Sequence, residues 1–220
     1  MGKQSSPPMD LPPLDDLREC LMDTEQPIGK RTHAAFFLRT LDTAAAVDVV
    51  CQALLNKSDS ALLRHELAYI LGQMQNPLAC VSLEGVLGDT DDDCMVRHEA
   101  AEALGAIGQE RSYPVLKLYA EDSAPEVSQT CQLALDLMEW RGQQHTQAAA
   151  AGAAAGGDVN PYQSVDPAPS ALVGEGVSTE ELGSRLRDQG SSLFRRYRRE
   201  RSSDGISKQI NLFIDSTDLF

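Results

Sequence analysis

A 33-residue internal repeat is the feature that most restricts how this chain can fold. The segment LRHELAYILG at 63–72 aligns with VRHEAAEALG at 96–105, and the matching residues are Arg, His, Glu, Ala, Leu and Gly. The same offset places Arg31 and Leu38 in an upstream copy, and a slightly shorter offset reaches 127–135. Repeats of this length are typical of stacked helical hairpins. We therefore predict four units, of which only the inner two carry a His-Glu pair.

The apolar residues support an all-α fold. They recur at helical spacing from Leu14 to Leu137, and the alternation expected of strands is nearly absent. The T-P-L-H-x-A motif of ankyrin repeats and the W-x-x-L-G motif of tetratricopeptide repeats do not occur at the required places. A HEAT-like α-solenoid of helical hairpins is the fold class that remains.

Prolines and glycines in the repeats indicate where helices begin and where they pack closely. Pro77, Pro114 and Pro125 fall between units, where each would end one helix or open the next. Gly72 and Gly105 lie inside the helical pattern, where glycine costs about 1 kcal/mol relative to alanine. We expect a neighbouring helix or a ligand to approach closely at both glycines.

Composition divides the chain into five segments. We predict a disordered arm at 1–13, four HEAT-like repeats at 14–145, an Ala/Gly/Pro-rich linker at 146–181, a short helix at 182–199 and a divergent tail at 200–220. Seven arginines and two acids give 185–201 a net charge of +5 in a chain that is otherwise −19. We interpret this basic stretch as a solvated helix face rather than a nucleic-acid site.

Net charge and cysteine content limit the partners and the compartment. The chain has 33 acidic and 19 basic residues, a balance that disfavours nucleic acid and suits a cationic partner. No apolar run is long enough to cross a bilayer, and no signal peptide is recognisable, so we expect a cytoplasmic protein that does not enter membranes. The five cysteines form no CxxC pair, which fits a reducing compartment. Residues 1–6 match the myristoylation pattern, but one acyl chain without a polybasic segment anchors only marginally.

The two His-Glu pairs are the candidate functional residues. Adjacent residues on a helix point about 100° apart, so one pair cannot easily chelate a single ion. Stacked repeats should instead place His65 beside His98 and Glu66 beside Glu99. Two imidazoles could then bind one metal while a carboxylate turns toward a second site, and two His with one carboxylate is the ligand set of non-haem iron oxygenases. Zinc would accept the same atoms, and His33 and His145 are predicted to be ordinary surface histidines.

At these residues the chain resembles the deoxyhypusine hydroxylase (deoxyhypusine monooxygenase) family. The resemblance rests on the two His-Glu segments at 60–75 and 95–108, on Glu139-Trp140 and on YQSVDPAP at 162–169, and it covers roughly residues 14–198. It implies a HEAT-like solenoid of two symmetric halves that together hold two Fe(2+) ions. It also implies dioxygen-dependent hydroxylation of a deoxyhypusine side chain on translation initiation factor 5A.

Carried onto this chain, the resemblance assigns four site residues. His65 and His98 would ligate one iron, Glu66 would reach the other, and Glu99 would face the amines of the substrate. The family has a second set of repeats after the linker, and LFRRYR at 193–198 resembles its opening helix, whereas the residues that follow depart from it. We therefore expect a chain that lacks most of the second half and is inactive alone.

Two other functions remain open from the sequence. The chain could be a metal-free helical-repeat scaffold, because solenoids commonly bind other proteins. It could also regulate the complete enzyme by associating with a second half or with another copy of itself. Iron content distinguishes an enzyme from a scaffold.

Overall fold

A computed structural model describes residues 11–150, and the side chains of 11–142. Within these residues every regular element is helical, which confirms the all-α prediction. The α-helices are α1 (Leu14–Met22), α2 (Ile28–Leu41), α3 (Ala44–Leu54), α4 (Ala61–Met74), α5 (Cys80–Gly88), α6 (Cys94–Ile107), α7 (Tyr113–Tyr119) and α8 (Pro125–Ala150). Two 3₁₀ turns, η1 (Pro77–Ala79) and η2 (Glu110–Ser112), lead into α5 and α7.

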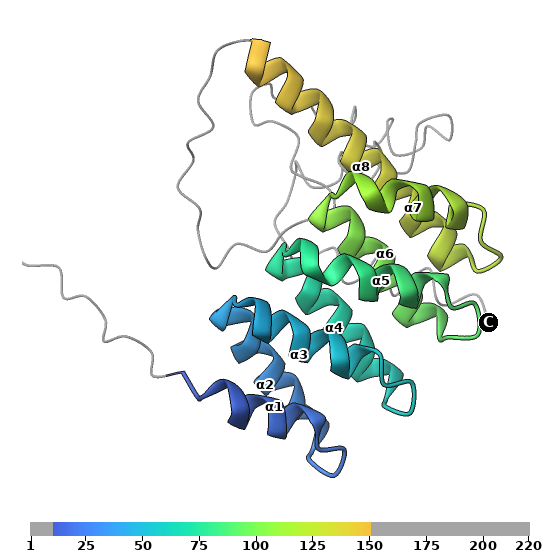
Figure 1. The fold of residues 1–220 in the computed structure, drawn as a ribbon. Coiled ribbons are helices and arrows are strands. Elements are labelled where there is room, and N and C mark those ends of the chain that lie inside the picture. Colours follow the sequence, from blue (N-terminus) through green and yellow to red (C-terminus); the bar gives the residue numbers. More distant parts are fainter. Residues whose placement is uncertain (1–10, 151–220) are drawn as a thin grey trace, which may run out of the picture.

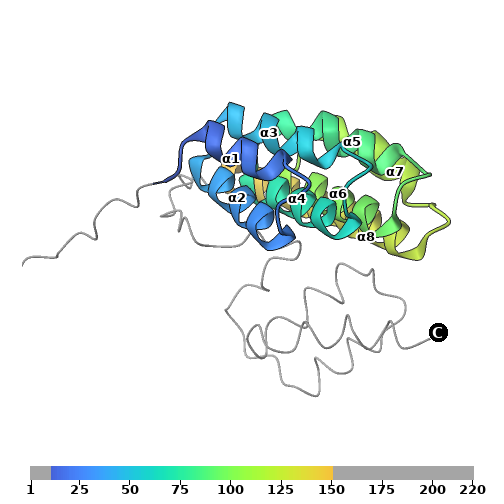
Figure 2. The ribbon, with the colours of Figure 1, turned by 90° about the horizontal axis from the view of Figure 1, so that it is seen from below.

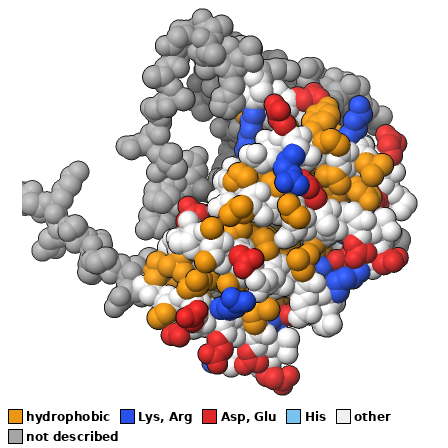
Figure 3. Space-filling view, viewed as in Figure 1, with side chains coloured by type: hydrophobic (Ala, Val, Ile, Leu, Met, Phe, Trp, Pro, Cys, Tyr) orange, Lys and Arg blue, Asp and Glu red, His pale blue; other side chains and the backbone are white. Residues whose placement is uncertain are grey.

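The helices form two layers of parallel rows (Figure 1). One row contains α1, α3, α5 and α7, and the other contains α2, α4, α6 and α8, as the view from below shows (Figure 2). Within the second row α4 packs on α2 and α6, and α6 packs on α8. Each hairpin therefore contributes one helix to each layer, as in a HEAT-like solenoid. In Figure 3, acidic side chains gather along the edge where the loops within the hairpins turn.

The prolines begin helical elements, as predicted, although Pro125 stands between the two helices of the last hairpin and not between units. Pro77 opens η1, Pro114 stands in the first turn of α7, and Pro125 begins α8. Helix α8 continues through Ala150, past the boundary at 145 that composition suggested. The physical reason is that alanine, which fills 148–150, has the highest helix propensity of all residues. Residues 1–10 and 151–220, with the rest of the predicted arm and linker, the short helix and the tail, lie outside the described residues.

Gly72 and Gly105 allow the helices of the second row to pack closely. A Cβ atom on Gly72 would lie 3.0 Å from the Cα of Ala103, and one on Gly105 would lie 2.6 Å from the Cβ of Ala134. The expectation of close approach at these glycines is confirmed, and in both cases the neighbour is a helix. The two glycines thus set the spacing of α4, α6 and α8, and with it the spacing of the His-Glu pairs.

Replacing Gly105 with Ala should destabilise the fold by about 1–3 kcal/mol, because the added methyl would overlap backbone that cannot move cheaply. The matched control is Gly85→Ala on α5, where nothing lies within 4 Å of the new Cβ. That control should be neutral or stabilising by up to about 1 kcal/mol, the difference in helix propensity. Urea unfolding followed by circular dichroism would measure both changes, and equal stabilities of the two variants would contradict the close packing.

Three buried arginines repeat at the 33-residue period and join successive hairpins. Arg31, Arg64 and Arg97 each donate from Nε to the backbone oxygen of the residue ten positions earlier, at 2.9, 2.7 and 3.1 Å. Their remaining guanidinium nitrogens donate to Asp59, Asp92 and Asp122 respectively, which lie in the loop of the next hairpin. We call these three pairs the Arg-Asp ladder. It fixes the register of each hairpin against the next.

The Arg-Asp ladder should make the fold sensitive to acid. Hydrogen bonds from the arginines hold the pKa of Asp59, Asp92 and Asp122 below the ordinary value of 3.8, against the opposing effect of burial. A carboxylate with a lowered native pKa stabilises the fold fully above its unfolded pKa, and this contribution disappears as pH falls toward the native pKa. The free energy of unfolding should therefore fall steeply below about pH 4. Denaturant titrations between pH 2 and 6 would test this, and a flat profile would contradict it.

Candidate metal centre

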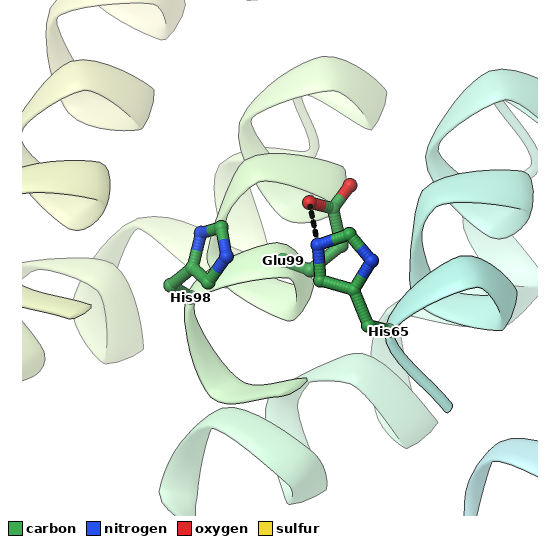
Figure 4. A group of neighbouring side chains, drawn as sticks. All are labelled: His65, His98 and Glu99. Carbon is green, nitrogen blue, oxygen red and sulfur yellow. Dashed lines mark ion pairs between the residues drawn. The ribbon is translucent and has the colours of Figure 1, made fainter. Parts of the chain in front are cut away.

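The candidate metal centre lies between α4 and α6, on helices held at a close distance. His65 occupies the second turn of α4, and His98 and Glu99 occupy the same register on α6. The Nε2 atom of His65 lies 3.2 Å from the Oε2 atom of Glu99 (Figure 4). The rings of His65 and His98 have centroids 5.5 Å apart and are tilted by 48°. The two predicted histidines therefore lie side by side.

His65, His98 and Glu99 can offer ligand atoms to one ion. One ligand atom from each of them lies within 4.8 Å of the other two. Two ligand atoms bound at right angles, each about 2.1 Å from an ion, lie about 3 Å apart, close to the separation of His65 and Glu99. His98 and Glu99 are each only 5% exposed, so the cluster is largely shielded from water. We call these three residues the His-His-Glu cluster.

Protonation in the His-His-Glu cluster differs between the two imidazoles. The hydrogen bond with Glu99 raises the pKa of His65, and burial opposes this effect. Burial lowers the pKa of His98, which keeps that ring neutral and its lone pair available near pH 7. A neutral imidazole and a carboxylate are the forms that bind metals.

The donor atoms of the cluster fit a metal. Two imidazole nitrogens and one carboxylate oxygen are a ligand set that iron and zinc both accept, and they come together where water is largely excluded. Coordination by His65 would use its Nε2 atom, which lies against Glu99. Its buried Nδ1 atom faces Glu66 instead and does not belong to this ligand set.

Glu66 lies outside the His-His-Glu cluster. Its Oε1 atom is 3.5 Å from the Nδ1 atom of His65, on the side of the ring away from Glu99. Repeat stacking alone suggested that Glu66 would lie beside Glu99, whereas the structure places Glu99 against His65. Glu99 points back from α6 toward the preceding hairpin, and this direction brings it to His65. His33 is exposed and stacks on Phe37 with ring centroids 4.7 Å apart, and the side chain of His145 lies outside the described residues.

The residues that position the His-His-Glu cluster were not predicted from the sequence. Arg64 and Arg97 immediately precede the two histidines and anchor α4 and α6 through the Arg-Asp ladder. The signal was present, because Asp59 and Asp92 are also 33 residues apart. Matching acids to arginines across neighbouring repeats would have found it.

None of the described helices is both long and apolar enough to cross a membrane.

Comparisons with known proteins identify chains of similar sequence. A HEAT repeats family model matches residues 47–136. Deoxyhypusine hydroxylase of Danio rerio is 48% identical over 180 residues, which cover 81% of this chain and 55% of the relative. The Homo sapiens and Drosophila melanogaster proteins of that name are 46% and 43% identical, covering 84% and 81% of this chain and 57% and 55% of each relative.

A solved structure gives the same result at the level of the fold. The structure of human deoxyhypusine hydroxylase in complex with glycerol superposes with a TM-score of 0.70 at 45% identity. The match covers 84% of this chain and 59% of that one, so the chain spans a little over half the length of the relatives it matches. The resemblance found in the sequence is confirmed: this is an all-α HEAT-repeat chain homologous to the deoxyhypusine hydroxylases.

Proposed function

We propose that this chain supplies one iron-binding half of a deoxyhypusine hydroxylase centre. The observation that carries the proposal is the His-His-Glu cluster, in which two imidazoles and one carboxylate come together between α4 and α6. The names of the relatives add the class of reaction. The substrate would be the deoxyhypusine side chain of translation initiation factor 5A, and the protein would act in the cytoplasm.

His65, His98 and Glu99 are the residues that would hold one Fe(2+) ion. This set differs from the assignment by resemblance, in which Glu66 would reach the other iron and Glu99 would face the amines of the substrate. Two bound irons would supply the electron transfer and open coordination positions that activation of dioxygen requires. The chain's own residues orient the ligands: Arg64 and Arg97 fix the helices, and Glu99 holds the Nε2 side of His65.

The charges around the cluster suit a cationic substrate. Glu66 and Glu99 both lie against the His65 ring, and the charge of Glu126 acts on His98. Three carboxylates near one site favour the ammonium groups of a deoxyhypusine side chain. Glu66, which is about one-third exposed and outside the cluster, is free to face such a group.

Ligand counting predicts that the 220-residue chain alone will not hydroxylate the substrate detectably. One cluster of two imidazoles and one carboxylate fits one ion, whereas a di-iron centre needs a second set. Adding a separately expressed segment that corresponds to the rest of the human relative should restore partial activity. The assay is hypusine formation on the deoxyhypusine form of factor 5A, with Fe(2+), dioxygen and a reductant present.

The matched control for this experiment is the His98→Ala chain mixed with the same added segment, which should stay inactive. Full turnover by the 220-residue chain alone would contradict the need for a second ligand set. Failure to bind iron in any combination would favour the scaffold function instead.

A further inference from the structure

A cavity of about 910 Å³ opens where α8 runs past the start of α7, at the last hairpin of the stack. In Figure 1 the far end of α8 projects beyond the other helices. The cavity is lined mainly by apolar groups, and the apolar side chains come from Ile107, Tyr113, Pro114 and Met138. None of its lining residues belongs to the His-His-Glu cluster. We call this feature the α8 cavity.

The charged groups of the α8 cavity favour a basic ligand. Glu110 and Glu139 line it and are exposed. Arg141, the one basic lining residue, is engaged elsewhere, because its Nη1 atom donates to the backbone oxygens of Ala106 at 2.5 Å and Gly105 at 3.3 Å. Those oxygens belong to the C-terminal end of α6, whose helix dipole is negative. The negative groups at the cavity, two carboxylates and a helix C-terminus, therefore outnumber its single positive charge.

The position of the α8 cavity leaves a helix face without a described neighbour. Helices α4 and α6 each pack against second-row helices on both sides, whereas the main contacts of α8 among the described elements are with α6 and α7. An apolar cavity on such a face is suited to bind a further chain segment that packs against α8.

We propose that residues 182–199 of this same chain bind in the α8 cavity. Their sequence carries large apolar residues at helical spacing, with Leu186 seven positions before Leu193 and Tyr197 four positions after it. Six of the seven arginines of 185–201 fall within 182–199, in a chain that is otherwise strongly acidic. The segment therefore offers apolar side chains for the cavity and cations for Glu110 and Glu139.

The chain is long enough for this contact to form within one molecule. From Gly142 to the end of α8 at Ala150 the helix rises about 12 Å. The 31 residues 151–181 then have a root-mean-square span of about 30 Å if they behave as a flexible coil, which exceeds the return distance. A tether of this kind gives an effective concentration near the millimolar range, so a contact of modest affinity suffices. This inference is independent of the proposed hydroxylase activity.

Hydrogen exchange of the full chain, read by mass spectrometry, tests the proposal. Amides of 182–199 should exchange at least about tenfold more slowly than in an isolated peptide of the same sequence. Met138→Glu, which places a charge among the apolar lining, should abolish this protection. Glu110→Lys, an exposed substitution that leaves the core intact, should reduce it. The matched control is Glu19→Lys, the same charge change on exposed α1 at the other end of the stack.

Any of three other outcomes would overturn the proposal. Amides of 182–199 that exchange at peptide rates in the wild-type chain would show that the segment does not dock. Protection that survives both cavity variants would place the segment elsewhere. Protection that grows with protein concentration would show that the occupant comes from a second copy of the chain.

Discussion

Replacing His65 with Ala should lower the affinity of the chain for Fe(2+) by at least about 100-fold, because it removes one of the ligands available in the His-His-Glu cluster. Helicity should be preserved, since the His65 side chain is 24% exposed and contributes little to the core. Anaerobic isothermal titration calorimetry would give the affinity, and circular dichroism would check the fold. The control is His33→Ala, which removes an exposed imidazole from α2, one position beyond the register of His65, and should leave iron binding unchanged.

Two carboxylate variants make this prediction sharper. Glu99→Gln should weaken iron binding strongly, whereas Glu66→Gln should have a much smaller effect on the same ion. The two substitutions are chemically identical and flank the same imidazole, so they differ only in which side of His65 they alter. Equal losses of iron affinity would show that both carboxylates bind the ion. A larger loss for Glu66→Gln would show that Glu66, and not Glu99, is the carboxylate ligand.

Replacing Arg64 with Ala should destabilise the fold by about 3–5 kcal/mol, because it would leave a buried carboxylate without its partner. Arg64 donates to both oxygens of Asp92, at 2.6 and 2.5 Å, and both side chains are at most 5% exposed. The backbone oxygen of Leu54 would also lose its donor. Many domains have a total stability of only about 5–15 kcal/mol, so the midpoint temperature of thermal unfolding should fall by roughly ten degrees or more.

A neighbouring ion pair provides the control for Arg64. Lys57 donates to Asp89 at 2.6 Å, but the two side chains are 48% and 36% exposed. Lys57→Ala should therefore leave the stability almost unchanged, because water and salt screen exposed ion pairs. The double variant Arg64→Met with Asp92→Leu should recover much of the loss, because it removes the unpaired charge. If the Arg64 and Lys57 variants proved equally mild, the Arg-Asp ladder would not stabilise the stack.

The fold class and the two histidines of the site could be predicted from local patterns in the sequence. The 33-residue period, the helical spacing of apolar residues and the position of Pro125 are local properties, because each depends on a few neighbouring residues. Two His-Glu pairs at one register of adjacent repeats must lie on adjacent helices. Glycine inside a helical pattern is also visible in the sequence, so a close contact could be expected at Gly72 and Gly105 before the neighbouring residues were known.

Two features could be seen only in the folded chain: which carboxylate joins the imidazoles, and what holds the helices in register. That choice depends on the rotation of α4 against α6, which brings Glu99 rather than Glu66 to the Nε2 atom of His65. The guanidinium of Arg64 finds Asp92 across 28 positions, through the packing of two hairpins. Helix orientation and side-chain direction arise from contacts distributed over the whole stack, so no local pattern in the sequence encodes them.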